Sequence, residues 1–232
     1  MNEFKEPSEQ QLRNLFDCYQ KGNYSEAEVL ATKISEEFPS NQLSWKILSS
    51  IFKQSGRLSK SLATGKKAVE LNIQDPDAHN NLGNTLRDMG RFKDSEVYFR
   101  KAIEIKPDFL DSHNGLGIAL YKTKKFKEAE LSFKKALELN PNLTGCNNNL
   151  GATLQELGKF KEAQKYLEKE LSINPGYIES YFNLGLIMHK LSRPEEAEIF
   201  YTKSTKRNPR YFQAYYNLGN LFQELDRPDE AE

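Results

Sequence analysis

The chain has 232 residues, 38% of them hydrophobic and 28% charged, a balance too polar for one thick globular core but normal for a thin core spread along many helices. Lys plus Arg and Asp plus Glu number 33 each, so no global field draws the chain to nucleic acid or anionic lipid. Because no apolar signal segment and no stretch of ~18 uninterrupted apolar residues occurs, we expect a cytoplasmic protein with no nucleic-acid or membrane partner.

The first elements in chain order are irregular copies of a later pattern. Residues 1–7 are expected to form an N-terminal extension, and a first repeat to begin near residue 8. That repeat has Leu15 where later repeats carry a small residue, and the second, from residue 42, has Ser49 in place of a later glycine. We interpret both as repeats that have drifted from a common signature.

From residue 76 onward the signature is regular. Its glycines, each 34 residues after the one before, are Gly83, Gly117, Gly151, Gly185 and Gly219. Within one repeat the apolar residues first follow an i, i+3, i+4, i+7 helical stripe and then do so again after a short turn. We therefore expect helical hairpins starting near residues 8, 42, 76, 110, 144 and 178, with a truncated one at 212, in one array that spans residues 8–232.

The last repeat stops at Glu232, where its second helix should begin. Natural arrays close with a polar cap, so we expect this chain to be the N-terminal part of a longer protein. An uncapped end would also allow self-association, which we keep as a third hypothesis.

The pattern resembles the tetratricopeptide repeat (TPR) family. The matching residues in the clearest repeat are Leu116, Gly117, Leu120, Phe126, Ala129, Phe133, Ala136 and Pro141. The resemblance covers nearly the whole chain and implies an all-α fold, an α-solenoid in which stacked helix-turn-helix units form a right-handed superhelix. In that family the first helix of each unit lines the inner, concave surface.

The recurring motif divides into structural and candidate binding residues. Glycine in mid-helix costs ~1 kcal/mol relative to alanine, so the repeated glycines predict a close approach of helices. The residue two before each glycine lies about 200° around the helix, so it points away from that contact. Asn81, Asn149, Asn183 and Asn217 occupy this position, and Gly115 interrupts the series.

An amide can both donate to and accept from a peptide backbone, so these asparagines are candidate ligands for an extended peptide, although a solvated polar surface is the alternative. The full predicted groove consists of Asn80, Asn81, Asn84, Asn114, Tyr121, Asn148, Asn149, Gln155, Asn183, His189, Tyr216, Asn217 and Asn220. The spacing is similar to an asparagine ladder in the TPR region of O-GlcNAc transferases, which grips the backbone of an extended substrate.

Two functions follow from these residues. The first is a protein-protein interaction scaffold whose groove binds an extended peptide or partner segment; the second is the substrate-recruiting arm of a larger enzyme, such as an O-GlcNAc-transferase-like glycosyltransferase. A carboxylate clamp for acidic chaperone tails is disfavoured, because Asp111 would repel a carboxylate and, among the clamp positions, only Lys46 and Asn81 suit the role.

We expect the segment itself to be non-catalytic and to use no cofactor or metal. Cys18 and Cys146 lie in no metal-binding pattern and are expected to pack, as are His79 and His113, while His189 has no motif partner. No nucleophile motif or phosphate loop occurs.

Two late positions break the pattern of the second helices. Glu170 and Ser204 occupy a position that is alanine in earlier repeats. A buried charge or hydroxyl is costly without a partner, so we predict that Ser204→Ala stabilises the protein.

Overall fold

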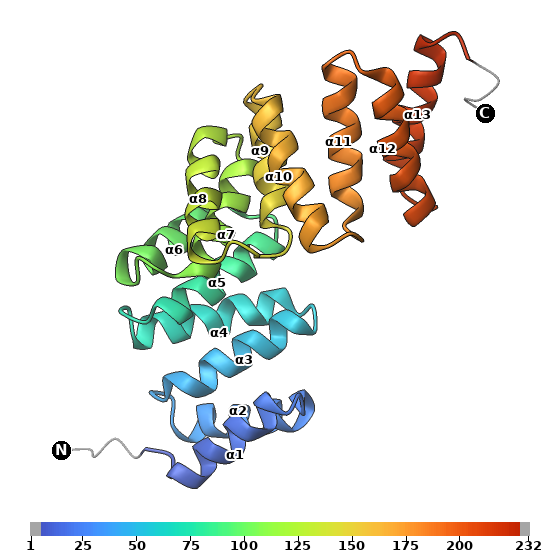
Figure 1. The fold of residues 1–232 in the computed structure, drawn as a ribbon. Coiled ribbons are helices and arrows are strands. Elements are labelled where there is room, and N and C mark those ends of the chain that lie inside the picture. The colour runs from blue at the N-terminus through green and yellow to red at the C-terminus, as the bar shows by residue number, and fades with distance from the viewer. Residues whose placement is uncertain (1–5, 228–232) are drawn as a thin grey trace. The chain divides into compact units, whose positions relative to one another are not determined.

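The computed structural model describes residues 6–227, and every regular element in that range is an α-helix (Figure 1). The helices are α1 Glu9–Gln20, α2 Tyr24–Glu37, α3 Gln42–Gln54, α4 Leu58–Leu71, α5 Pro76–Asp88, α6 Phe92–Ile105, α7 Leu110–Lys122, α8 Phe126–Leu139, α9 Cys146–Glu156, α10 Phe160–Ile173, α11 Ile178–Lys190, α12 Pro194–Arg207 and α13 Phe212–Glu224. The predicted all-α solenoid of helix-turn-helix repeats is confirmed.

The chain divides after Thr123 into two compact parts. We call residues 6–123 the N-terminal block and residues 124–227 the C-terminal block, and describe each by itself. In the N-terminal block each helix packs on the next in sequence, and the odd-numbered helices α3, α5 and α7 also contact one another in that order. Its core includes Leu15, Leu82, Leu86 and Phe99, all essentially inaccessible to solvent.

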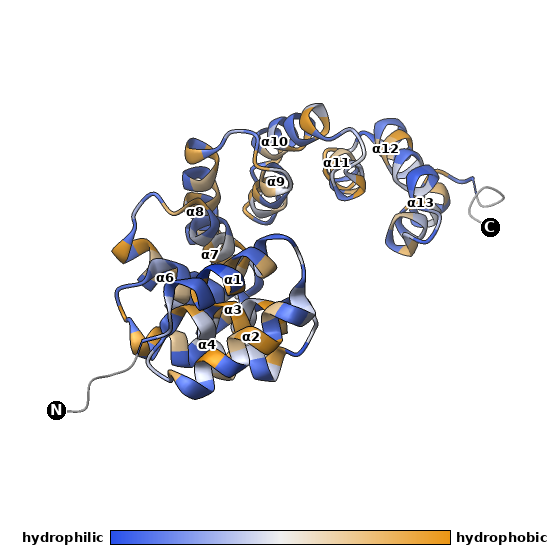
Figure 2. Ribbon diagram, turned by 90° about the horizontal axis from the view of Figure 1, so that it is seen from below, coloured by the Kyte–Doolittle hydropathy of each residue, from blue (hydrophilic) through white to orange (hydrophobic). Residues whose placement is uncertain are grey.

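The C-terminal block is built in the same way. Helices α9 and α10, then α11 and α12, form antiparallel hairpins that stack through α10 on α11 and α12 on α13. Leu150, Leu167, Leu184 and Tyr201 are fully buried between them. Figure 2 shows hydrophobic and hydrophilic stretches alternating along the helices of both blocks, as expected when each helix buries one face.

The predicted close approach of the helices is confirmed at Gly83, Gly151 and Gly185. A Cβ at Gly83 would lie 2.9 Å from the Phe99 ring, and one at Gly185 would lie 2.5 Å from the Tyr201 ring. These rings belong to the second helix of the same hairpin, so the missing side chain is what allows the two helices to pack. The energetic cost of glycine within the first helix is thereby offset by the burial of an aromatic ring.

One residue in each hairpin turn has a positive φ angle, as required for a left-handed turn between antiparallel helices. These residues recur every 34 positions and are Gly22, Gly56, Gly90, Lys124, Gly158, Ser192 and Asp226. A side chain at Gly90 would meet no atom within 4 Å, so glycine is favoured there by backbone conformation alone. The short turn predicted between the two helices of each repeat is therefore present.

Ion pairs 29 residues apart join neighbouring hairpins. Arg57 binds Glu28 at 2.6 Å in the N-terminal block, and Lys159 binds Glu130 at 2.8 Å in the C-terminal block. The Arg57 guanidinium hydrogen bond lowers the pKa of the Glu28 carboxyl. Each cation precedes a second helix and reaches back to the second helix of the preceding repeat, so it helps to hold neighbouring repeats together.

Candidate functional site

The predicted groove residues lie on the first helices of the repeats. We define the first-helix face as the surface formed by α1, α3, α5 and α7 in the N-terminal block and, separately, by α9, α11 and α13 in the C-terminal block. The ladder residues Asn81, Asn149, Asn183 and Asn217 are all half-buried on it. They are therefore neither core residues nor fully solvated.

A second column of asparagines, one residue before the ladder, bonds to the next repeat. Asn80 is 6% exposed, and its Oδ1 accepts a hydrogen bond of 3.0 Å from the Ser112 hydroxyl. Asn148 is 7% exposed, and its Oδ1 accepts from the Ser180 hydroxyl at 3.1 Å and from Asn183 Nδ2 at 2.9 Å. These amides connect neighbouring first helices.

The signal for this role was in the sequence, as a serine 32 residues after each bonded asparagine. Asn114 has Cys146 at that distance instead, and within the described part of the chain its buried Oδ1 has no hydrogen-bond partner. The column therefore has a structural function in at least two repeats, in addition to any part in binding.

The ladder amides differ in how much hydrogen-bonding capacity they retain. Asn183 donates to Asn148, and Asn217 donates from Nδ2 to the Gln213 carbonyl at 2.7 Å. Within residues 6–227 the side chains of Asn81 and Asn149 make no hydrogen bond. One amide in each block therefore keeps its full capacity to bind a peptide unit.

Packing explains why Gly115 interrupts the ladder. A Cβ at this position would lie 2.5 Å from Cζ of Phe99, which is itself fully buried. Any side chain, including asparagine, would have to displace that ring. Gly115 is therefore required by the contact between α6 and α7.

The remaining predicted groove residues fall into three environments. Asn84, Tyr121, Gln155 and Asn220 are half-buried, whereas Tyr216 is 70% exposed. The third environment is that of His189, for which the sequence predicted no partner side chain. His189 Nε2 lies 2.7 Å from Oε2 of Glu224, one helix further along the same face.

The histidines predicted to pack do so. His79 and His113 are at most 9% exposed, and each donates from Nε2 to a loop carbonyl six residues earlier, at Ile73 and at Pro107. Trp45 reaches the Pro39 carbonyl in the same way. In the fifth repeat this position is Asn147.

Asn147 is fully buried, and both polar atoms of its amide lack a hydrogen bond within the described residues. Its side chain is shorter than the tryptophan, histidine or tyrosine that fills this position in other repeats. The loop before α9 differs too, with Gly145 at a φ of 78°.

The predicted burial of Glu170 and Ser204 is confirmed, since both are 0% exposed. Oε1 of the Glu170 carboxylate accepts the Gly145 N–H at 2.8 Å, while Oε2 has no partner in the described chain. Burial, aided by the negative charge of Glu170, raises the pKa of the Cys146 thiol to about 12. Cys146 is therefore an inert packing residue, as expected.

The N-terminal block has a hollow of about 310 Å³ on its first-helix face. The first helices of four successive repeats line it: α1, α3, α5 and the start of α7. Asn80 and the free amide of Asn81 both lie on its wall. This hollow is thus the place where predicted ligand residues and a cavity coincide.

An ion pair lies at one wall of this hollow. Lys46 Nζ is 2.7 Å from Asp75 Oδ2, and both side chains are mostly buried. Burial by itself raises the pKa of the Asp75 carboxyl, but the Lys46 charge and two backbone N–H groups outweigh it, so the net pKa is lowered. Asp75 therefore stays ionised as the N-cap of α5.

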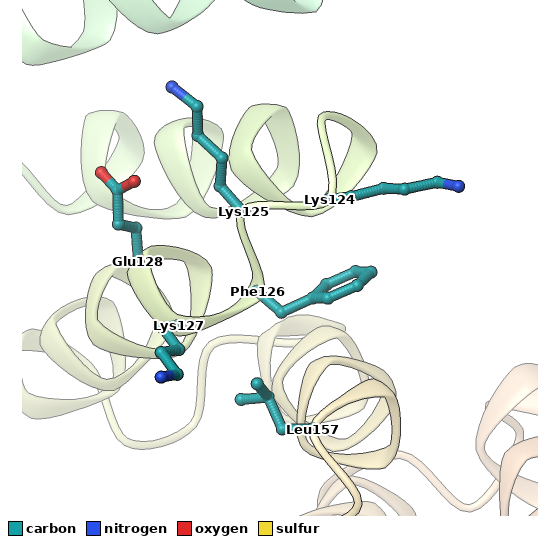
Figure 3. A pocket seen from close by; sticks show the side chains of 6 residues that line it. All are labelled: Lys124, Lys125, Phe126, Lys127, Glu128 and Leu157. Carbon is teal, nitrogen blue, oxygen red and sulfur yellow. The ribbon is translucent and has the colours of Figure 1, made fainter.

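Two further hollows arise from the repeat geometry. One of about 360 Å³ is lined by residues 124–128 and Leu157, and one of about 420 Å³ by residues 90–94 and Thr123. Each residue of the first lies 34 positions after its counterpart in the second. Figure 3 shows Phe126 and Leu157 beside the first hollow while Lys124 and Lys125 extend away from each other. Because such hollows recur at hairpin turns, they carry no specific assignment.

Across residues 6–227, no helix is both long enough and apolar enough to cross a membrane. In the same range, no group of three or more His, Cys, Asp or Glu side chains is arranged to hold a metal ion.

Solved structures with the same fold include three of similar size. The peptide-binding TPR protein YrrB is 24% identical (TM-score 0.69) over 81% of this chain and 96% of its own. The type IV pilus biogenesis factor PilW is 19% identical (TM-score 0.78) over 91% and 100%, and PilF of Pseudomonas aeruginosa 18% (TM-score 0.75) over 94% and 95%. No curated protein matched the sequence.

Family models identify the repeats directly. Models described as tetratricopeptide repeat match residues 76–109 and 110–143, residues 144–210, and residues 200–232. Together they cover more than half of the chain, and their first two boundaries coincide with the starts of α5 and α7 to within a residue. With 34-residue helical hairpins throughout, the chain belongs to the tetratricopeptide repeat family.

Proposed function

We propose that this protein is a protein-protein interaction scaffold that binds an extended peptide or partner segment on its first-helix face. The observation that carries the proposal is the hollow of about 310 Å³ that crosses four successive first helices and has the free Asn81 amide on its wall. A cavity of this size is at the lower end of those that bind ligands.

The chemistry of the face supports an extended peptide. A backbone peptide unit offers one donor and one acceptor, and an asparagine side chain matches both. Asn81 and Asn149 occupy the same position in their repeats and have no competing intramolecular hydrogen bond in the described chain. The peptide-binding site named for YrrB belongs to a protein of the same fold, which is consistent with this use.

The test is a selection of nine-residue peptides on the intact chain, followed by fluorescence anisotropy of the best binders. We expect Asn81→Ala with Asn149→Ala to weaken binding about tenfold, because a peptide bound to either block loses the donor and the acceptor of one amide, two hydrogen bonds of ~0.5–1.5 kcal/mol each. A matched control, Lys66→Ala with Lys165→Ala on exposed positions of α4 and α10, should bind like the unmodified chain. Equal affinity of all three proteins would overturn the proposal.

The second candidate is the recruiting arm of a larger enzyme. It rests on Asn81, Asn149, Asn183 and Asn217, whose spacing resembles the ladder of O-GlcNAc transferases and which lie half-buried on the first helices of their repeats. The sequence of the intact gene beyond Glu232 tests it, since a catalytic domain there would favour this candidate.

Self-association is tested by sedimentation velocity over a concentration series, and a monomer throughout would contradict it.

A further inference from the structure

The hollow on the N-terminal block has a distinct chemical character. Its apolar part comes from aromatic and aliphatic side chains of α1 and α3, among them Phe16, Tyr19 and Leu43. Phe16 is 44% exposed, which is high for so large an apolar ring. An apolar side chain placed in the hollow would remove this ring from water.

Among the described residues that line the hollow, Lys46 is the one cation, and it is already paired. Lys46 Nζ contacts the Asp75 carboxylate at 2.7 Å, and their side chains are only 23% and 11% exposed. Asp75 in turn accepts the backbone N–H groups of Asp77 and Ala78. The Lys46 charge is therefore held inside the protein and offers little attraction to an anionic ligand.

The anions on the wall are more accessible. Asp77 is 63% exposed at its side chain, and its carboxylate is 3.9 Å from Lys46 Nζ, beyond hydrogen-bond distance. Asp111 is exposed, and within residues 6–227 it forms no ion pair. Both lie in the first turns of their helices, where a carboxylate also stabilises the helix. Because Asp75, which does not itself line the hollow, neutralises Lys46, the Asp77 and Asp111 carboxylates leave the described wall with an excess of two negative charges.

From this geometry we infer that the hollow binds a segment in which an aromatic or aliphatic side chain is adjacent to a lysine or arginine. The apolar side chain would lie against Phe16 and Leu43, and the cation would lie between Asp77 and Asp111. Acidic tails and phosphorylated segments would be repelled by the same carboxylates. The inference rests on the proposed function, because it specifies which peptides the first-helix face accepts.

The experiment uses a random nine-residue peptide library selected in parallel on three forms of the intact chain. One is unmodified, one carries Asp77→Asn with Asp111→Asn, and the control carries Asp17→Asn with Glu36→Gln, two exposed acidic residues of α1 and α2 that do not line the hollow. The unmodified and control proteins should enrich peptides with Lys or Arg beside an apolar residue. The Asp77 and Asp111 variant should bind those peptides about tenfold more weakly.

A second pair of variants tests the apolar part. Phe16→Ala should lower the affinity for the same peptides, whereas Val29→Ala, at an exposed position of α2, should leave that affinity unchanged. Circular dichroism of each variant shows whether the fold is retained, and raised salt should weaken binding through the screened carboxylates.

The outcomes separate the two proposals. If the selected peptides depend on Asn81 and Asn149 but are acidic, or bind equally when Asp77 and Asp111 are neutralised, this inference is overturned and the proposed function stands. If no peptide is enriched on the unmodified chain, or binding is indifferent to the asparagines, the proposed function itself fails.

Discussion

The N-terminal and C-terminal blocks use one repeat signature, but they differ in how well their local requirements are met. Every described turn of the N-terminal block has glycine at its positive φ angle, whereas three of the four in the C-terminal block have Lys124, Ser192 and Asp226. Buried polar atoms without partners also concentrate in the C-terminal block, at Asn147, Glu170, Tyr201 and Ser204. In the described N-terminal block such atoms occur at His79 and Asn114.

A constant repeat period therefore does not ensure that every hairpin has a glycine in its turn and a partner for each buried polar atom. Stability in a solenoid is approximately a sum over repeats and the interfaces between neighbours, so a local cost stays local. The C-terminal block retains its helices because they share a buried apolar core. Its non-glycine turns and unpaired buried polar atoms lower its free energy of unfolding. We expect it to open at lower free energy than the N-terminal block.

The largest expected effect comes from placing an asparagine, the ladder residue of every repeat in the C-terminal block, at the one position of the N-terminal block where Gly115 interrupts the series. Gly115→Asn should lower the free energy of unfolding by about 3 kcal/mol, because its Cβ meets the Phe99 ring in a filled core. Urea unfolding measures the loss. Combined with Phe99→Leu, the penalty should be smaller than the sum of the two single changes, and strict additivity would contradict the packing explanation.

The next effect compares the two bonded asparagines. Asn148→Ala should cost about 2 kcal/mol and Asn80→Ala about 1 kcal/mol, because the first accepts two hydrogen bonds and the second one. Hydrogen exchange followed by mass spectrometry would place each loss in its own block. Adding Ser180→Ala to Asn148→Ala should recover part of the loss, since it removes a hydroxyl left without its partner; equal losses at the two asparagines would refute this reading.

A smaller effect should follow from repairing a turn of the C-terminal block. Lys124→Gly should raise the free energy of unfolding by about 0.5–1 kcal/mol, since glycine adopts a positive φ without steric cost. The reciprocal change Gly90→Lys has open space around the new side chain and should lose a similar amount. Thermal unfolding measures the change in melting temperature of both variants. A change in the same direction for both would contradict the explanation based on the positive φ angle.

The smallest effect concerns the buried hydroxyl of α12. Ser204→Ala should stabilise the chain by about 0.5 kcal/mol, because the fully buried hydroxyl has no partner in the described residues. Ser95→Ala is the control, since Ser95 is equally buried but donates to the Phe92 carbonyl and should not gain. Calorimetry distinguishes them, and a lower melting temperature for Ser204→Ala would go against the prediction.

Much of the fold could be predicted because its signals are local and periodic. The glycine register, the burial of Leu116 and Ala136, and the packing of His79 all follow from helical spacing. The candidate site was harder to predict from the sequence. The position of Asn81 on a first helix, pointing away from the glycine contact, was predicted from helical spacing. The hydrogen bond from Ser180 to Asn148, the contact of His189 with Glu224 and the hollow beside Phe16 were not, because they join residues of different repeats.

The sequence by itself determined the 34-residue period, the helical hairpins and the identity of the helix that carries the asparagines, because each depends on residues within a turn or two of helix. Only the tertiary structure decided which asparagines are committed to neighbouring repeats, why Gly115 must lack a side chain, and where a cavity with exposed carboxylates lies. Those features depend on distances between side chains from successive repeats, and such distances are set by how the hairpins pack.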